Sequence, residues 1–135
     1  MITRRQALAW AGLALALGAS SLFFMIVQVS PFLADGTMNT PAVALFVLAF
    51  AVLMFGLGSL IALWIHRRWP SLTGVSPKQK TVPGNAALRQ GFWVACAATI
   101  VAVLALMQEL DIILVLITFG LMGLMEAYAQ SRASR

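Results

Sequence analysis

Glu126 is the side chain of this sequence whose type and position best suit chemistry. It lies near the end of the last apolar run, is followed by Gln130 at i+4, and is the one acid on the basic side of the chain. Ionisable residues within apolar spans often mark ion pathways or proton relays. Glu126 is therefore a candidate gating or ion-contacting carboxylate. The plainer interpretation, which we favour, pairs it with Arg89, Arg67 or Arg132.

Three further polar residues lie at the other ends of the apolar runs. Glu109 and Asp111 stand two residues apart and could attract a cation, although such a pair more often solvates a turn. Gln28 could donate a hydrogen bond across helices. No ionisable residue lies in the middle of an apolar run, and the sequence has no phosphate-cradling loop, zinc motif or nucleophile–base pattern. We therefore expect no enzyme, no metal site and no cofactor.

The elements that must position these side chains are four long apolar runs. Apolar residues make up 61% of the 135 residues and charged residues 10%, against ~45–50% and ~25% in a soluble domain. A membrane span needs roughly 20 apolar residues, and only a helix satisfies the backbone of such a segment in lipid. We predict one all-α transmembrane domain over residues 1–135, an integral membrane four-helix bundle of two antiparallel hairpins. Its spans are 7–29, 42–65, 86–107 and 112–128. We expect Thr40 to be the N-cap of the second helix, with Pro41 at its first helical position, and Asn85 to cap the third.

The distribution of charge predicts a topology. All nine Lys and Arg residues fall on one side of the spans, five of them between the second and third runs, whereas Asp35, Glu109 and Asp111 fall on the other. Basic flanks stay in the cytoplasm, so both termini and the loop 66–85 should be cytoplasmic. The aromatic residues Trp10, Trp64, Trp69, Trp93 and Tyr128 gather on the same side. Arg67, Arg68, Lys78 and Lys80 would attract anionic lipid headgroups, at ~1 kcal/mol per charge. The topology thus accounts for the net charge of +5, and we expect no nucleic-acid partner.

The N-terminus has an alternative interpretation. Arg4-Arg5 before an apolar run resembles a twin-arginine export signal, with a cleavage site near Ala16. The apolar run continues to Val27, well beyond the 7–15 residues usual for a signal. We therefore expect an uncleaved first span, with cleavage as the alternative.

Small residues form stripes along the spans. The third span carries Gly91, Ala95, Ala98 and Ala102 on one helical face, and the fourth carries Gly120 and Gly123. Small residues let helix backbones approach closely in lipid. These stripes either bury each other within one bundle or leave one stripe free for an oligomer.

Families with four short spans offer a loose comparison. Small multidrug-resistance proteins have a glutamate in the first span, and small fluoride channels have a glycine- and arginine-rich signature; the sequence has neither. The second half, with Leu88-Arg89-Gln90, a tight polar turn and Glu126-Ala127-Tyr128, resembles short uncharacterised four-span proteins of bacteria with reduced genomes. That resemblance implies a bacterial inner membrane and does not imply any particular activity.

The function that we expect is a small membrane scaffold or accessory subunit, which packs through its Ala/Gly stripes against itself or another membrane protein. The alternative is a small oligomeric channel or transporter with its path between protomers.

Overall fold

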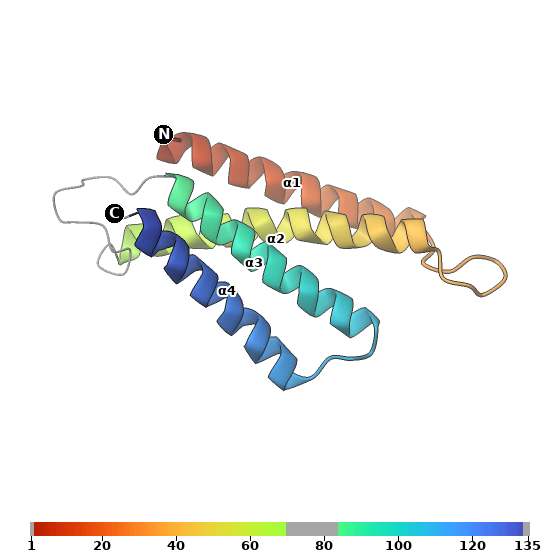
Figure 1. The fold of residues 1–135 in the computed structure, drawn as a ribbon. Helices are drawn as coiled ribbons and strands as arrows, with labels where there is room; N and C mark the ends of the chain where they lie inside the picture. Colours follow the sequence, from red (N-terminus) through yellow and green to blue (C-terminus); the bar gives the residue numbers. More distant parts are fainter. Residues whose placement is uncertain (1, 70–83, 134–135) are drawn as a thin grey trace.

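The chain forms four consecutive helices with no strand among the residues described. The structure, a computed structural model, describes residues 2–69 and 84–133. The helices are α1 (Arg4–Gln28), α2 (Thr40–Arg68), α3 (Gly84–Leu106) and α4 (Ile112–Ala133). Each is long and apolar enough to cross a membrane. Successive helices run in opposite directions, so the N- and C-terminal ends of the chain lie at one end of the molecule (Figure 1).

Capping interactions fix where the helices begin, and they extend the helices beyond the predicted spans. Thr3 forms a capping box with Gln6 ahead of α1. The Asn39 side chain caps α2, so Thr40 is already helical and the prediction of Thr40 as the cap is wrong by one residue. Asn85 is also inside its helix, because α3 begins at Gly84. The Asn85 Oδ1 instead accepts a hydrogen bond from the Ile2 amide, at 3.2 Å, which ties the start of α1 to the start of α3.

Glycine residues mark the points where α1, α2 and α3 touch. A Cβ placed on Gly18 would overlap Leu53, and one on Gly56 would meet the backbone of Ala11 and Leu15, both across the α1–α2 contact. Such contacts are possible only because the residue has no side chain, which is how helices pack closely in lipid. The α1–α2 pair is therefore joined backbone to backbone along much of its length.

The α2–α3 contact is equally close but shorter. Gly58 lies against Val94 and Gly91, and Gly91 lies directly over the Ser59 hydroxyl. Ser59 is completely buried. Further along, α3 diverges from α2 towards Leu106, while its start lies close to α1 through Gly84 (Figure 1).

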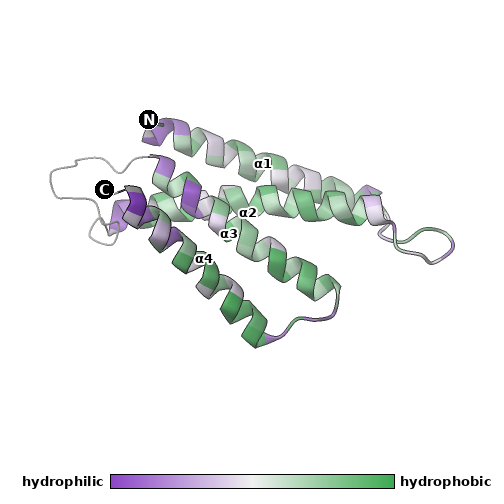
Figure 2. Cartoon of the chain, in the orientation of Figure 1, coloured by the Kyte–Doolittle hydropathy of each residue, from purple (hydrophilic) through white to green (hydrophobic). Residues whose placement is uncertain are grey.

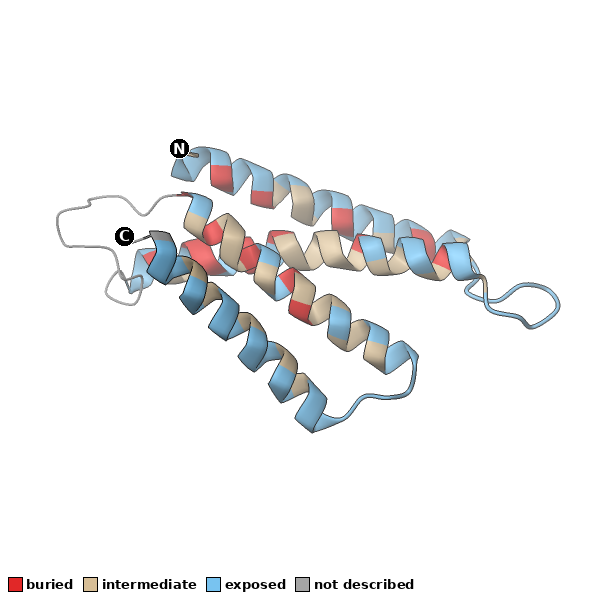
Figure 3. Cartoon of the chain, viewed as in Figure 1, coloured by how far each residue is buried: buried red, intermediate tan, exposed pale blue. Residues whose placement is uncertain are grey.

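The fourth helix is the least buried. It contacts α3 and neither of the other helices. No described residue of α4 is buried, whereas α1, α2 and α3 each have several (Figure 3). Only the face that contains Met122 and Glu126 is partly covered, so the rest of α4 is open to its surroundings.

Candidate functional site

A bidentate ion pair between α3 and α4 is the main polar feature within the helices. The Arg89 Nε donates to Glu126 Oε2 at 2.9 Å, and the Arg89 Nη2 donates to Glu126 Oε1 at 3.0 Å. The Gln130 amide adds a third donor to Oε1 at 2.9 Å. Of the three arginines that the sequence offered as partners for Glu126, Arg89 is the one in contact. Because the pair is fork-shaped and hydrogen-bonded on both oxygens, it belongs to the stronger class of ion pairs.

Both residues of the ion pair lie within their helices, more than one turn from the helix end. Arg89 comes about one and a half turns after the start of α3, and Glu126 about two turns before the end of α4. The Glu126 side chain is 13% exposed and that of Arg89 34%. A lone carboxylate at this position would be costly to bury. The arrangement therefore neutralises Glu126 and fastens α4 to α3.

Two residues that the sequence did not single out as partners extend this contact to α2. The Gln90 side chain interacts with both Glu126 and His66. His66 is buried in the last turn of α2, and its Nδ1 has no hydrogen-bond partner among the described residues. Polar side chains of α2, α3 and α4 thus interact near the end of the molecule that carries the termini, where Figure 2 shows hydrophilic residues on the helices.

Sequence position held a signal for this contact. Arg89 lies 17 residues before Leu106, and Glu126 lies 14 residues after Ile112. In an antiparallel hairpin with a short turn, residues at similar distances from the turn face each other. By that rule, Arg89 is a better partner for Glu126 than Arg67 or Arg132. The same rule places Gln90, which follows Arg89, near Glu126.

A cavity of about 230 Å³ separates the middle parts of α3 and α4. Trp93 and Ile100 line it from α3, and Met122 and Met125 line it from α4. The Trp93 indole N–H is buried and has no acceptor among the described residues. The two helices are therefore held together by the ion pair, and they pack less closely around the cavity, between the ion pair and the α3–α4 turn.

The polar residues at the end of the molecule opposite the termini lie in or beside the turns between helices. The Asp111 Oδ1 accepts from the Ile113 amide at 3.2 Å and so caps α4. Glu109 is exposed in the α3–α4 turn. Gln28 is the exposed last residue of α1, and its side chain makes no hydrogen bond within the described part of the chain. Asp35, in the α1–α2 loop, accepts from the Thr37 hydroxyl at 2.6 Å and the Thr37 amide at 2.9 Å. These two bonds lower the pKa of the Asp35 carboxyl below its ordinary value.

The predicted headgroup-binding residues are only partly covered by the structure. Arg67 and Arg68 are exposed in the last turn of α2. Lys78 and Lys80 lie outside the described residues. Arg132 stacks over the Tyr128 ring, with 5.6 Å between the guanidinium carbon and the ring centre.

The residues predicted to pack helices divide into three groups. Gly91 and Ala95 are buried, while Ala98 and Ala102 are only half-buried because α3 diverges from α2. A Cβ on Gly120 or Gly123 would meet nothing within 4 Å. These two glycines make no helix contact within one chain, so packing at their surface needs another molecule.

The described residues contain no group of three His, Cys, Asp or Glu side chains that could hold a metal ion. Neither the polar contact nor the turns bring together a nucleophile and a base. No family model matches the chain, and no curated protein sequence or solved structure is significantly similar to it.

Proposed function

We propose that this chain is a small, non-enzymatic scaffold or accessory subunit of a bacterial inner membrane, and that it binds a second copy of itself through the outward face of α4. We define this α4 face by Gly120, Gly123 and Ala127. The observation that carries the proposal is the contrast between these glycines and those of the other helices.

Most helical glycines of the described chain lie at a contact. A Cβ on any of five of them would come within 3.0 Å of a neighbouring helix or segment; these are Gly18, Gly56, Gly58, Gly84 and Gly91. Three face open space, namely Gly12, Gly120 and Gly123. Two of those three share the α4 face. A glycine that faces lipid contributes no packing and lowers helix stability, whereas one at a helix contact permits close approach.

The exposure of α4 supports the same interpretation. Leu116 and Leu124, which flank the α4 face, are 66% and 71% exposed. Large residues beside a small-residue groove are the arrangement in which two helices interlock in a membrane. Because α4 contacts only α3 among the described helices, its opposite side is free to pack against the same side of a second copy. Dimers with twofold symmetry are the commonest closed assemblies.

The α4 face favours a scaffold over the alternative, a channel between protomers. A water-filled path needs polar or ionisable groups along it. Leu116, Gly120, Gly123 and Ala127 offer none, and Glu126 is turned towards α3 through its ion pair with Arg89.

We infer the orientation of the chain in the membrane from the positions of its charged residues. Arg4, Arg5, Arg67, Arg68 and Arg132 all lie at or near the end that holds the termini, and Asp35, Glu109 and Asp111 lie at the opposite end (Figures 1 and 2). We infer from the positive-inside rule that the termini are cytoplasmic.

Leucine substitutions at two glycines whose Cβ positions have no neighbour within 4 Å test the proposal. Gly123→Leu fills the α4 face, while Gly12→Leu adds the same side chain to an open site on α1. We expect the wild type and the Gly12→Leu variant to be dimeric by mass in detergent or nanodiscs. Gly123→Leu should weaken the dimer at least about tenfold, or ~1.4 kcal/mol. A monomeric wild type, or equal loss in both variants, would contradict the proposal.

A further inference from the structure

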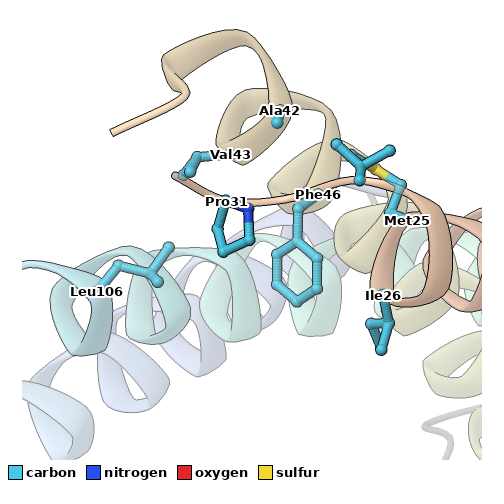
Figure 4. A pocket seen from close by; sticks show the side chains of 8 residues that line it. Met25, Ile26, Pro31, Ala42, Val43, Phe46 and Leu106 are labelled. Atoms are coloured by element: carbon cyan, nitrogen blue, oxygen red, sulfur yellow. The ribbon is translucent and has the colours of Figure 1, made fainter. Parts of the chain in front are cut away.

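An apolar cavity lies at the end of the molecule opposite the termini, where α3 has diverged from α2. Its volume is about 340 Å³. Met25 and Ile26 line it from α1, Val43 and Phe46 from α2, Leu106 from α3, and Pro31 from the loop after α1 (Figure 4). The cavity is thus lined by three helices and a loop and is open on one side, and it lies apart from the α3–α4 polar contact and from the α4 face.

Water does not suit this space. Every residue that lines the cavity is apolar. A water molecule needs two to four polar partners to occupy a cavity, and apolar cavities stay dry. The neighbouring outward surface of α1 is apolar as well, with Phe24 60% and Ile26 71% exposed. The medium at the mouth of the cavity is therefore hydrocarbon, because these residues belong to helices long and apolar enough to cross a membrane.

A protein helix does not suit it either. The lining residues fall within 25–29, at and just beyond the end of α1, within 42–46 of α2, and at Leu106, the last residue of α3. This is a height of roughly 6 Å at 1.5 Å per residue. A helix that crosses the membrane is ~30 Å long and needs a groove along much of that length. The lined stretch is far shorter than that, so a spanning helix cannot lie along it. A flexible linear chain can enter from the side.

We infer that this cavity binds an acyl chain of a phospholipid from the leaflet opposite the termini. The size lies within the ~300–1,000 Å³ range of small-ligand sites. Pro31 marks the level at which the helix gives way to the polar loop, so the segment of acyl chain near the glycerol backbone is the part that fits. Bound there, the chain fills the space between α2 and α3 and holds the two helices at their present separation.

Photo-crosslinking with a phospholipid of defined label position tests this inference. The probe carries a diazirine on the acyl chain close to the glycerol, is reconstituted with the full-length protein in liposomes, and its adducts are mapped by mass spectrometry. We expect adducts on Phe46 and Leu106 to exceed those on the exposed Leu116 of α4 several-fold. A probe with the diazirine at the terminal methyl should lose that preference.

Two matched variants separate a specific site from general contact with lipid. Val43→Trp fills the cavity, whereas Ala44→Trp puts the same ring on the adjacent exposed position of α2. Val43→Trp should abolish the excess of adducts at Phe46 and Leu106, and Ala44→Trp should retain it. Equal labelling of Phe46, Leu106 and Leu116 in the wild type would overturn the inference. So would a lack of lipid adducts at Leu106 and Phe46, the result expected if a second protein chain occupied the space. If Val43→Trp fails to fold, Phe46→Ala enlarges the cavity instead, and labelling at Leu106 should then persist.

Discussion

At the scale of single residues, the contact between Gly91 and Ser59 is the tightest point of the fold. An added Cβ on Gly91 would lie on the Ser59 hydroxyl, 2.7 Å from the Ser59 backbone nitrogen and 2.9 Å from the Phe55 carbonyl oxygen. Two of these three atoms belong to the backbone and cannot move aside by a change of rotamer. The α2–α3 separation is therefore set by the absence of a side chain at position 91.

Gly91→Ala should consequently destabilise the protein by about 1–3 kcal/mol, the usual cost of overpacking. Ser59→Gly should restore little of this, because the backbone clashes remain. Helix unfolding by sodium dodecyl sulfate, followed by circular dichroism, measures the effect. Gly12→Ala is the matched control, and we expect it to keep wild-type stability since its Cβ meets nothing within 4 Å and Gly12 lies outside the α4 face. Equal stability of the Gly91→Ala and Gly12→Ala variants would refute the argument.

The Arg89–Glu126 pair is the second residue-scale feature with a measurable consequence. The pair is intermediate between exposed pairs, worth ~0–1 kcal/mol, and buried ones, whose disruption costs ~3–5 kcal/mol. A double-mutant cycle with Arg89→Gln and Glu126→Gln should give a coupling energy of roughly 1–3 kcal/mol. Expression of the Glu126→Gln variant should fall, because the carboxylate is structural. Normal expression together with altered ion flux would instead support a gating role for Glu126.

Contacts of single residues could be predicted from the sequence where burial of a charge requires a partner of opposite charge. An acid near the end of a span needs a cation, so Glu126 could be assigned a short set of arginines that included Arg89. Helix starts shifted by one residue because neighbouring residues, Asn39 and Thr40, both suit a cap. His66 could not be foreseen as buried, since a histidine next to two arginines at a helix end resembles a surface residue.

At the scale of elements, the α3–α4 hairpin depends on an unusual turn. The Gln108 amide donates to the Ala105 carbonyl and the Glu109 amide to the Leu104 carbonyl, which closes α3 with a Schellman motif. Gln108 takes the left-handed conformation, with φ of 61°. Glycine normally occupies that position, so this cap could not be predicted from residue types, and only the shortness of the turn pointed to it.

Gln108→Gly should therefore stabilise the hairpin by up to about 1 kcal/mol, since a non-glycine residue costs ~1–2 kcal/mol in this conformation and glycine loses part of that gain to the entropy of the unfolded chain. The midpoint of unfolding by sodium dodecyl sulfate should rise. A lower midpoint would show that the Gln108 side chain contributes a contact that outweighs the strain. Gln108→Ala, which keeps the strain, should match the wild type.

Element-scale prediction identified stripes of small residues but not their partners. Periodicity places Gly91, Ala95, Ala98 and Ala102 on one face of α3, yet it cannot show that α3 diverges from α2 beyond Ala95. Phe46 of α2 and Leu106 of α3 line the apolar cavity where the two helices have diverged, and periodicity along one helix carries no information on such a separation. For the same reason, the sequence left open whether the glycines of α4 pack within the chain.

At the scale of the whole molecule, composition alone sufficed to predict four helices long and apolar enough to cross a membrane. The charge pattern further predicts their orientation, because basic residues and the acids Asp35, Glu109 and Asp111 lie at opposite ends of the molecule. What composition could not predict is the incomplete packing, in which α4 contacts α3 alone. The shape leaves one helix face open, and this open face is the basis of the proposed self-association.

Cysteine labelling in intact cells tests the orientation. The native cysteine is first removed as Cys96→Ala. A membrane-impermeant maleimide applied from outside should then label Asp35→Cys and Glu109→Cys, and should reach Ser131→Cys only after the membrane is permeabilised. The reverse pattern would place the basic end outside and refute the cytoplasmic assignment of the termini.

Disulfide cross-linking through the α4 face tests the central claim most directly. In the Cys96→Ala background, Gly123→Cys is oxidised in native membranes and compared with Gly12→Cys, its equally open counterpart on α1. A disulfide needs Cα atoms about 4.4–6.8 Å apart, a separation that two helices reach at a glycine contact. We predict a rapid covalent dimer from Gly123→Cys and little from Gly12→Cys. A Gly123→Cys protein that stays monomeric, or that cross-links no faster than Gly12→Cys, would contradict the account.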